Sequence, residues 1–244
     1  NNNDNNNNNI DDINLSIQHV LNCATDMAGS CHGGKESGTY QWIHQKNGFV
    51  VYDTCQPYLA CSHESQEGFC PFIDTTCTAI NTCRTCDSTE CKPMDSFPYA
   101  SIAEYGVVKS RNVTEIMAEI IARGPVSAHV HGASLHNYRG GIFNDTHADR
   151  HTTHAVSIVG WGVTGTTATT ATAGTTFWIV RNSWGQYWGE MGFFRIAVGE
   201  NILGIETCIS WATPGSFTTA KEQVVYVDPS ANIASLKERL HYKK

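Results

Sequence analysis

A hydrophobic stripe with helical spacing is the clearest pattern in the second half of the chain. Between residues 112 and 123, apolar side chains recur at positions i, i+3, i+4, i+7 and i+8, which predicts an amphipathic helix with one buried face. The stripe consists of Val113, Ile116, Met117, Ile120 and Ile121. Gly124 and Pro125 follow directly and are expected to end the helix.

Patterns typical of β-strands follow this helix. Apolar residues alternate with polar ones after Pro125, and runs rich in β-branched and aromatic residues come later in the chain. The predicted strands lie in the ranges 126–130, 154–162, 177–181 and 194–198. We expect an antiparallel sheet or barrel over residues 126–211, with the helix packed against it. Its core should contain Ile158, Val180 and Phe194.

Two polar residues stand at the ends of these strands. His154 opens one strand, and Asn182 directly follows another, with Trp184 and Trp188 close behind it. A hairpin joining the two strands would place His154 beside Asn182. An asparagine among tryptophans suggests a polar group shielded from water, so both tryptophans are expected to cover the pair.

The first half of the chain predicts short helices and irregular loops. Ser16 is expected to cap a helix over residues 15–21. Residues 36–47 read as a second helix, which Gly48 should end. From residue 50 to residue 91, cysteines are dense and helical periodicity is lacking, so disulfides are expected to set the shape.

Three segments carry little or no pattern of buried positions. The Asn-rich residues 1–12 are expected to be disordered. A Thr/Ala/Gly run between residues 163 and 176 predicts a solvated, mobile hairpin loop. Residues 213–244 are expected to form a tail with a weakly amphipathic helix near residues 233–240, to which we assign no function.

Composition narrows the classes of function. A chain of 244 residues, 41% hydrophobic and 16% charged, is long enough for one large domain or two small lobes. The net charge of −7 and the pI near 5.8 argue against a nucleic-acid or anionic-membrane partner. No run approaches the ~20 apolar residues of a membrane helix. We therefore expect neither nucleic acid nor membrane as a partner.

The cysteines indicate an oxidising compartment. Ten are present, and nine of them lie between Cys23 and Cys91, as in a segment stapled by disulfides. Glycosylation sequons begin at Asn14, Asn112 and Asn144, which is compatible with a secretory route. We expect the protein in the lysosome or outside the cell.

Two long motifs resemble a known family. The segments HAVSIVGWG (154–162) and WIVRNSWGQYWGEMGFFRI (178–196) closely resemble the histidine and asparagine blocks of papain-like cysteine peptidases. The resemblance implies that His154 is the acid/base and Asn182 its orienting amide, since a thiolate nucleophile needs an imidazole partner held in one tautomer. It also implies peptide or protein substrates, no cofactor and no bound metal.

The same resemblance implies a fold and further site residues. The fold would be α+β, a papain-like two-lobe fold with an antiparallel β-barrel right lobe and an incomplete, disulfide-rich helical left lobe. Gly33 and Gly34 resemble the glycine pair that lines the family's cleft, where a substrate backbone can approach closely, and Trp184 is expected to contact substrate. The expected parts are an Asn-rich segment (1–12), a left-lobe remnant (13–105), a right lobe with the catalytic His and Asn (106–212) and a tail (213–244).

The run Cys83-Arg84-Thr85-Cys86, with Cys91 after it, resembles the corresponding segment of the cathepsin Z-like members of the family. Those members trim C-terminal residues. That resemblance implies the disulfides Cys23–Cys70, Cys55–Cys83 and Cys86–Cys91, with the left-over pair Cys61–Cys77. Cys31 and Cys208 are expected to be free. The family partner of Cys31 would lie in a block that the 244 residues lack, and that of Cys208 would fall near Ala128.

The family's nucleophile block is missing from the 244 residues. Members carry a Cys-Gly-Ser-Cys-Trp-like block, preceded by a glutamine that helps to stabilise the oxyanion, and no cysteine here sits in such a block. Removing one member of a cooperating catalytic set can cost on the order of 10⁶ in rate. We therefore expect a partial sequence of a cathepsin Z-like peptidase, inactive as given.

Two other classes of function stay open. A pseudopeptidase would bind peptides or partners through the remaining cleft wall without cleaving them. A disulfide- or zinc-organised binding module is the other, because Cys83, Cys86 and Cys91 include the Cys-x2-Cys spacing of zinc ligands. Against zinc, no second pair follows at finger spacing. Three further histidines lie in and after the predicted strand 126–130 and read as surface or strand residues: His129, His131 and His136.

Overall fold

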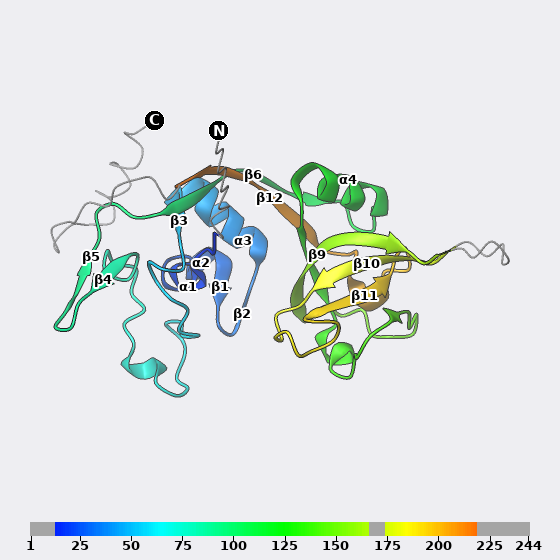
Figure 1. Ribbon diagram of the computed structural model, residues 1–244, viewed down its shortest axis with the longest axis horizontal. Coiled ribbons are helices and arrows are strands. Elements are labelled where there is room, and N and C mark those ends of the chain that lie inside the picture. Colours follow the sequence, from blue (N-terminus) through cyan, green and yellow to red (C-terminus); the bar gives the residue numbers. More distant parts are fainter. Residues whose placement is uncertain (1–12, 166–173, 219–244) are drawn as a thin grey trace, which may run out of the picture. The chain divides into compact units, whose positions relative to one another are not determined.

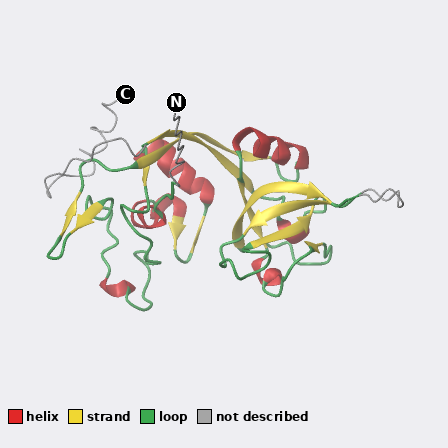
Figure 2. Cartoon of the chain, viewed as in Figure 1, coloured by secondary structure: helices red, strands yellow, loops and turns green. Residues whose placement is uncertain are grey.

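The computed structural model describes residues 13–165 and 174–218 (Figure 1). These residues fall into two compact units, of which the second is Tyr105–Thr213 and the first contains the rest. Short helices and loops make up most of the first unit, and the large sheet strands, together with loops, characterise the second (Figure 2). Three expectations lie outside the described residues: the disordered N-terminus, residues 166–173 of the hairpin loop, and the helix near residues 233–240.

Both helices predicted in the first unit are present, although the first begins and ends two residues later than the predicted range 15–21. α1 (Ile17–Cys23) follows Ser16, whose hydroxyl accepts an amide hydrogen bond at 3.0 Å, as an N-cap serine does. α3 (Glu36–Gln41) continues into a π-helical turn at Trp42–Asn47, and Gly48 ends it with a φ of 88°. Both predicted helices are confirmed, and the π-helical turn is an addition to the second.

Short antiparallel pairs complete the first unit. A tight hairpin joins β1 to β2, a second hairpin joins β4 to β5, and β3 pairs with the start of β6. The bounds are α2 (Thr25–Ala28), β1 (Gly29–Ser30), β2 (Gly33–Gly34), β3 (Val50–Val51), a 3₁₀ turn (Cys70–Phe72), β4 (Arg84–Cys86), β5 (Cys91–Pro93) and β6 (Tyr99–Val108). Two small hydrophobic cores, around Trp42 and around Phe49, hold these pieces together.

Half of the expected disulfide pairing is confirmed. The bonds that form as expected are Cys55–Cys83 and Cys86–Cys91. The two cysteines expected to be free, Cys31 and Cys208, are free and exposed.

The expected pairs Cys23–Cys70 and Cys61–Cys77 are wrong, because Cys61 bonds to Cys70 and Cys23 bonds to Cys77. Cys61 and Cys70 are separated by 9 positions, so a local turn is enough to bring them together. The family resemblance implied pairs between cysteines further apart in the sequence, and it did not anticipate a bond across this short loop.

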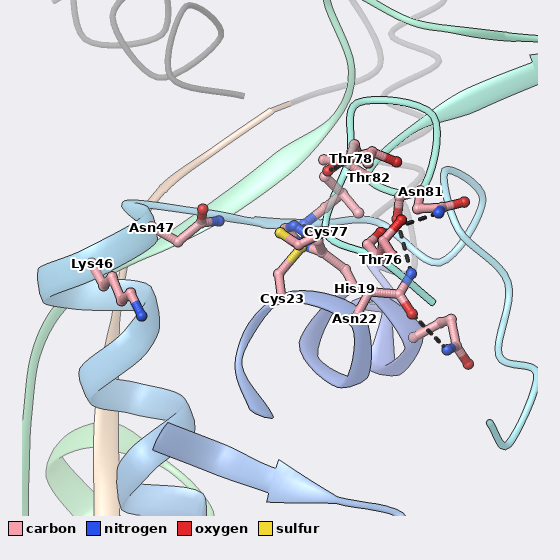
Figure 3. Close-up of a disulfide and its surroundings, with 12 residues drawn as sticks. His19, Asn22, Cys23, Lys46, Asn47, Thr76, Cys77, Thr78, Asn81 and Thr82 are labelled. Carbon is pink, nitrogen blue, oxygen red and sulfur yellow. Dashed lines mark hydrogen bonds between the residues drawn. A yellow bond between two sulfur atoms is a disulfide. The ribbon is translucent and has the colours of Figure 1, made fainter. Parts of the chain in front are cut away.

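Hydrogen bonds beside α1 explain why Cys23 bonds to Cys77 and not to Cys70. The side-chain amide of Asn22 donates to the backbone carbonyl of Asn81 at 3.1 Å. The side-chain amide of Asn81 donates in turn to the backbone carbonyl of Thr76 at 3.1 Å. Figure 3 shows both bonds next to the Cys23–Cys77 disulfide. They hold the turn that carries Cys77 against the end of α1, where Cys23 stands.

A sheet dominates the second unit, in the strand order β12-β7-β9-β10-β11-β8. Within it β7–β9, β9–β10, β10–β11 and β7–β12 are antiparallel, as predicted, but β8 and β11 are parallel. The long connection between β8 and β11 permits this parallel pairing at the edge. The bounds are β7 (Val126–Val130), β8 (Ile142–Phe143), β9 (His154–Val163), β10 (Thr176–Arg181), β11 (Phe193–Ala197) and β12 (Ile209–Phe217).

The predicted amphipathic helix and its core are confirmed. α4 (Val113–Arg123) begins after Asn112, whose side-chain oxygen accepts the Glu115 amide at 3.2 Å. Within its stripe Ile116 and Ile120 are buried, whereas Ile121, at the edge of the stripe, is exposed. The same core contains the three residues expected to share it, Ile158, Val180 and Phe194. Two 3₁₀ turns, Gly132–Leu135 and Ile202–Gly204, complete the unit.

The C-terminal part of the described chain is a strand. Residues 213–217, the first part of the expected tail, lie in β12. The Ser216 amide donates to the Ser101 hydroxyl at 2.8 Å. Among the described helices, none has the length and apolar character to cross a membrane.

Candidate active site

His154 and Asn182 meet because of the way β9 pairs with β10. Arg181, the last residue of β10, lies opposite Ser157 of β9, so the next residue lies near the start of β9, where His154 stands. Nε2 of His154 and Oδ1 of Asn182 are 2.7 Å apart. The juxtaposition predicted from the two strand patterns is therefore present.

A second hydrogen bond fixes the orientation of the Asn182 amide. The backbone amide of Ser183 donates to the same Oδ1 atom at 2.8 Å. Since a backbone N–H only donates, the atom that faces His154 is the oxygen, and Nε2 of His154 carries the hydrogen. Nδ1 then presents its lone pair, which is the form that a general base requires.

Aromatic rings shield the pair from water. Trp184 stacks on His154, with ring centroids 5.0 Å apart and planes at 29°. Trp188 stands edge-on to Trp184, with centroids 5.1 Å apart, so it supports the covering ring. Asn182 is only 8% exposed. A hydrogen bond in such surroundings is stronger than one in water.

Gly132 packs against His154 and was not predicted. A Cβ atom added at Gly132 would lie 2.9 Å from the Cβ of His154, closer than side-chain atoms approach one another. The Gly132 amide donates to the Thr153 hydroxyl at 3.2 Å, so its backbone is held in place. No local pattern marks this glycine, because the contact joins segments about twenty residues apart.

His136 is a second neighbour that the pattern did not mark. Its imidazole lies edge-on to Trp184, with centroids 5.1 Å apart and planes at 65°. The side chain is exposed, as expected of a surface residue. Its contact with the indole that covers His154 makes it part of the site.

The loop after β10 is anchored by charge. Glu190 accepts hydrogen bonds from Nε of Arg195 and from the Gly141 amide, both at 2.9 Å. The bond from the Arg195 guanidinium is the main reason why the pKa of the Glu190 carboxyl lies below its ordinary value. The Tyr138 hydroxyl donates to the Gly141 carbonyl at 2.6 Å, and burial raises the pKa of this tyrosine.

An open groove of about 640 Å³ adjoins Asn182 in the same unit. Its walls combine polar residues of the loop after β10 with apolar side chains from the sheet and loop. The main lining residues are Arg181, Ser183, Gln186, Val159, Met191 and Phe193.

The glycine pair expected to line a cleft lies in the first unit. Gly33 and Gly34 form β2 and are exposed. A Cβ at Gly34 would lie 2.1 Å from the Ala28 carbonyl oxygen, so the close pairing of β2 with β1 requires glycine there. Contact of these glycines and of Trp184 with substrate stays a prediction.

The disulfides of the described residues remove thiolates that the zinc alternative requires. Cys83 and Cys86 are consumed in disulfides, and zinc needs free thiolates. The described residues include no group of three or more His, Cys, Asp or Glu arranged to hold a metal ion. Within the described part of Tyr105–Thr213, no cysteine forms a hydrogen bond with His154, and Cys208 is exposed.

Known proteins of one family match most of this chain. The family described as papain family cysteine protease matches residues 2–213. Cathepsin Z of Onchocerca volvulus is 32% identical over 209 residues, which cover 82% of this chain and 60% of the relative. Cathepsin B-like cysteine proteinase 4 of Caenorhabditis elegans is 33% identical, with the same two shares covered. The chain thus spans 60% of the length of these two curated relatives.

Solved structures agree on the fold. The bromelain protease of Ananas comosus, solved with the inhibitor E64, is 28% identical with a TM-score of 0.60, over 82% of this chain and 78% of that one. Digestive procathepsin L 3 of Tenebrio molitor has a TM-score of 0.59 over 82% and 56% of the two chains, but at 24% identity it shows the fold alone. The expected α+β, papain-like fold is confirmed. With its match across residues 2–213, the chain belongs to the papain family of cysteine proteases.

Proposed function

We propose that this chain is the base-bearing part of a cathepsin Z-like cysteine peptidase that removes C-terminal residues from peptides or proteins. The observation that carries the proposal is the 2.7 Å hydrogen bond between Nε2 of His154 and Oδ1 of Asn182. It leaves Nδ1 of His154 for the proton of a thiol. The stacked Trp184 keeps the hydrogen bond to Asn182 away from water.

The chemistry follows from these roles. His154 takes the proton of a cysteine thiol, and the thiolate attacks the peptide carbonyl to form an acyl-enzyme. The protonated imidazole then gives its proton to the leaving amine, and it later takes a proton from the water that releases the acyl group. Asn182 holds the ring in one orientation through both steps.

The nucleophile is proposed to come from sequence outside the 244 residues. These residues contain no Cys-Gly-Ser-Cys-Trp block, and without a thiolate there is no acyl-enzyme. The chain alone is therefore expected to be inactive. The described disulfides suit an oxidising compartment, which supports a lysosomal or extracellular location and glycosylation of the sequons.

The test is to supply the missing block. A segment with the Gln and the Cys-Gly-Ser-Cys-Trp block of a cathepsin Z-like relative is joined ahead of Leu15, and peptide hydrolysis is measured. The grafted protein should hydrolyse peptides and should lose this activity after thiol alkylation. His154→Ala should abolish the activity, whereas His147→Ala, at an exposed histidine, should leave it unchanged. Hydrolysis by the ungrafted chain, or full activity of the His154→Ala graft, would overturn the assignment.

A pseudopeptidase is the second candidate, and the lack of the nucleophile block favours it. Such a protein would bind peptides through the groove beside Asn182 and would never cleave them. Genomic sequence immediately upstream separates the two candidates. A coding Gln and Cys-Gly-Ser-Cys-Trp block supports the peptidase, and an upstream sequence without them supports the pseudopeptidase.

A further inference from the structure

The imidazole of His131 joins two segments that meet at His154. Its Nδ1 atom lies 2.8 Å from the hydroxyl of Ser134, within the 3₁₀ turn Gly132–Leu135. Its Nε2 atom lies 3.8 Å from the carboxylate of Asp149, in the segment that leads into β9. The His131 side chain is only 20% exposed. This imidazole therefore bridges the turn and the segment before β9.

Both bridged segments contact His154 or adjoin it. Gly132, the residue after His131, leaves no room for a Cβ atom beside the Cβ of His154. Thr153 directly precedes His154, and its amide donates to the Val130 carbonyl at 2.9 Å. The Thr153 hydroxyl accepts the Gly132 amide at 3.2 Å. A looser connection between the turn and the segment would therefore let His154 move.

The charges around His131 make the bridge depend on pH. The pKa of the Asp149 carboxyl lies below its ordinary value, chiefly because the His151 backbone amide donates to it. Asp149 thus keeps its charge in mild acid, where an imidazole gains charge, below about pH 6.5. Among the described residues, His131 otherwise contacts neutral groups, namely the Ser134 hydroxyl and the Leu203 carbonyl, which accepts its amide at 2.9 Å. The His151 imidazole is the other titratable cation that acts on Asp149.

We propose that His131 is a positioning residue for His154, acting through a bridge to Asp149 that tightens when the His131 imidazole is protonated. The inference rests on the proposed function for the role of His154, and it adds a further residue and a pH dependence to that role. A charged imidazole bonds to a carboxylate more strongly than a neutral one does. The bridge therefore holds the turn and the segment together in mild acid and loosens as the pH rises above about 6.5.

Hydrogen exchange in the 244-residue chain tests the bridge without a nucleophile. Protection factors of the Gly132 and Thr153 amides are measured by NMR at pH 5.5 and pH 7.5, after correction for the intrinsic exchange rate at each pH. Both amides should be about two- to fivefold better protected at pH 5.5, as expected for one partly exposed ion pair. His131→Gln and Asp149→Asn should each remove this difference, because each variant keeps a polar side chain but loses its charge.

Two other histidines of the same segment provide matched controls. His147→Gln, at an exposed position, and His151→Gln should both keep the difference between pH 5.5 and pH 7.5. Equal protection at both pH values in the unaltered chain would overturn the role of His131. A difference that persists in His131→Gln, or that disappears in His151→Gln, would overturn it as well.

Kinetics of the grafted protein provide a second readout. His131→Gln should lower kcat about two- to fivefold at pH 5.5, leave KM within twofold, and have no effect at pH 7.5. An equal loss of kcat at both pH values would indicate a merely structural role and would overturn the inference. If the graft hydrolyses no peptide, the proposed peptidase function fails, while the exchange measurements still decide whether His131 forms the bridge.

Discussion

Single residues around His154 hold one imidazole in one orientation. The Asn182 oxygen fixes Nε2 at 2.7 Å, Trp184 covers one face of the ring, and Gly132 leaves room at Cβ. Each contact has a different effect. The hydrogen bond limits rotation of the ring, the indole keeps water away, and the glycine lets the residue sit close to the segment before β8.

A methyl group at Gly132 should displace His154. In Gly132→Ala the new Cβ would lie 2.9 Å from the Cβ of His154, so the histidine must move and its bond to Asn182 must weaken. Proton NMR of the 244-residue chain should show the Nε2–H resonance of His154 shifted and exchanging faster with water. Gly160→Ala is the matched control, because a Cβ at Gly160 meets nothing within 4 Å. An unchanged resonance in Gly132→Ala would contradict the packing argument.

The residues found from sequence are those that carry a local signature. His154 opens a strand and Asn182 stands before Trp184, so the strand pattern alone brings His154 and Asn182 together. Gly132 and His136 have no such signature. They reach the site through packing between β7, the 3₁₀ turn Gly132–Leu135 and the loop after β10, and no periodicity encodes contacts of this kind.

At the scale of elements, the loop after β10 positions half of the site. The backbone amide of Asn182 donates to the Gly192 carbonyl at 2.9 Å, which closes the loop at its base. Glu190 ties the loop to β11 through Arg195 and to the turn before β8 through Gly141. Trp184 and Trp188 are therefore presented by a loop that is fixed at several points.

The Glu190 anchor should depend on pH. The pKa of this carboxyl is lowered, chiefly by the bond from Arg195, so its contribution to stability is complete above the ordinary carboxyl pKa of about 4.3. The contribution is lost as the pH falls through the lowered pKa of the folded state. Glu190→Gln should lower the free energy of unfolding by up to about 1 kcal/mol near pH 7, since the pair is partly exposed.

Urea unfolding between pH 7 and pH 3 checks this expectation. The difference between the unaltered chain and Glu190→Gln should shrink as the pH falls. Glu200→Gln, at an exposed position, should show no such difference. A Glu190→Gln difference that stays constant to pH 3 would mean that charge does not hold the loop.

Periodicity predicted the elements that are long or capped. α4 follows from its apolar stripe, α1 from the Ser16 cap, and β7 from alternation. The parallel pairing of β8 with β11 could not be read, because β8 has two residues and its partner lies about fifty residues further along the chain. The π-helical turn Trp42–Asn47 also lacks a sequence signal, since its spacing differs little from that of an α-helix.

At the scale of the whole molecule, the disulfides are concentrated in the first unit. That unit has small cores and few long elements, so covalent links should supply a large share of its stability. The family resemblance identified the fold and the eight bridged cysteines. It assigned two of the bonds wrongly, because it did not anticipate the short turn that joins Cys61 to Cys70 or the hydrogen bond of Asn22 with Asn81.

The disulfides should differ in how much each adds to the free energy of unfolding, according to the length of the loop that it closes. Cys23–Cys77 spans 54 positions and Cys86–Cys91 spans 5. Loop-closure entropy then predicts a loss of roughly 4 kcal/mol on removing the first bond and roughly 2 kcal/mol on removing the second. Unfolding of the paired Cys→Ser variants in urea checks the order. A larger loss for Cys86 and Cys91 would contradict it.

We infer that Asn182 and His154 act together as the base of a cysteine peptidase. The most direct test is kcat/KM for peptide hydrolysis by the grafted protein with and without Asn182→Ala. General acid–base catalysis is worth about 10²–10⁴ in rate, so releasing the imidazole should cost a substantial part of it, about 10- to 100-fold, mainly in kcat. A kcat/KM value within twofold of that of the unaltered graft would contradict this joint role of Asn182 and His154.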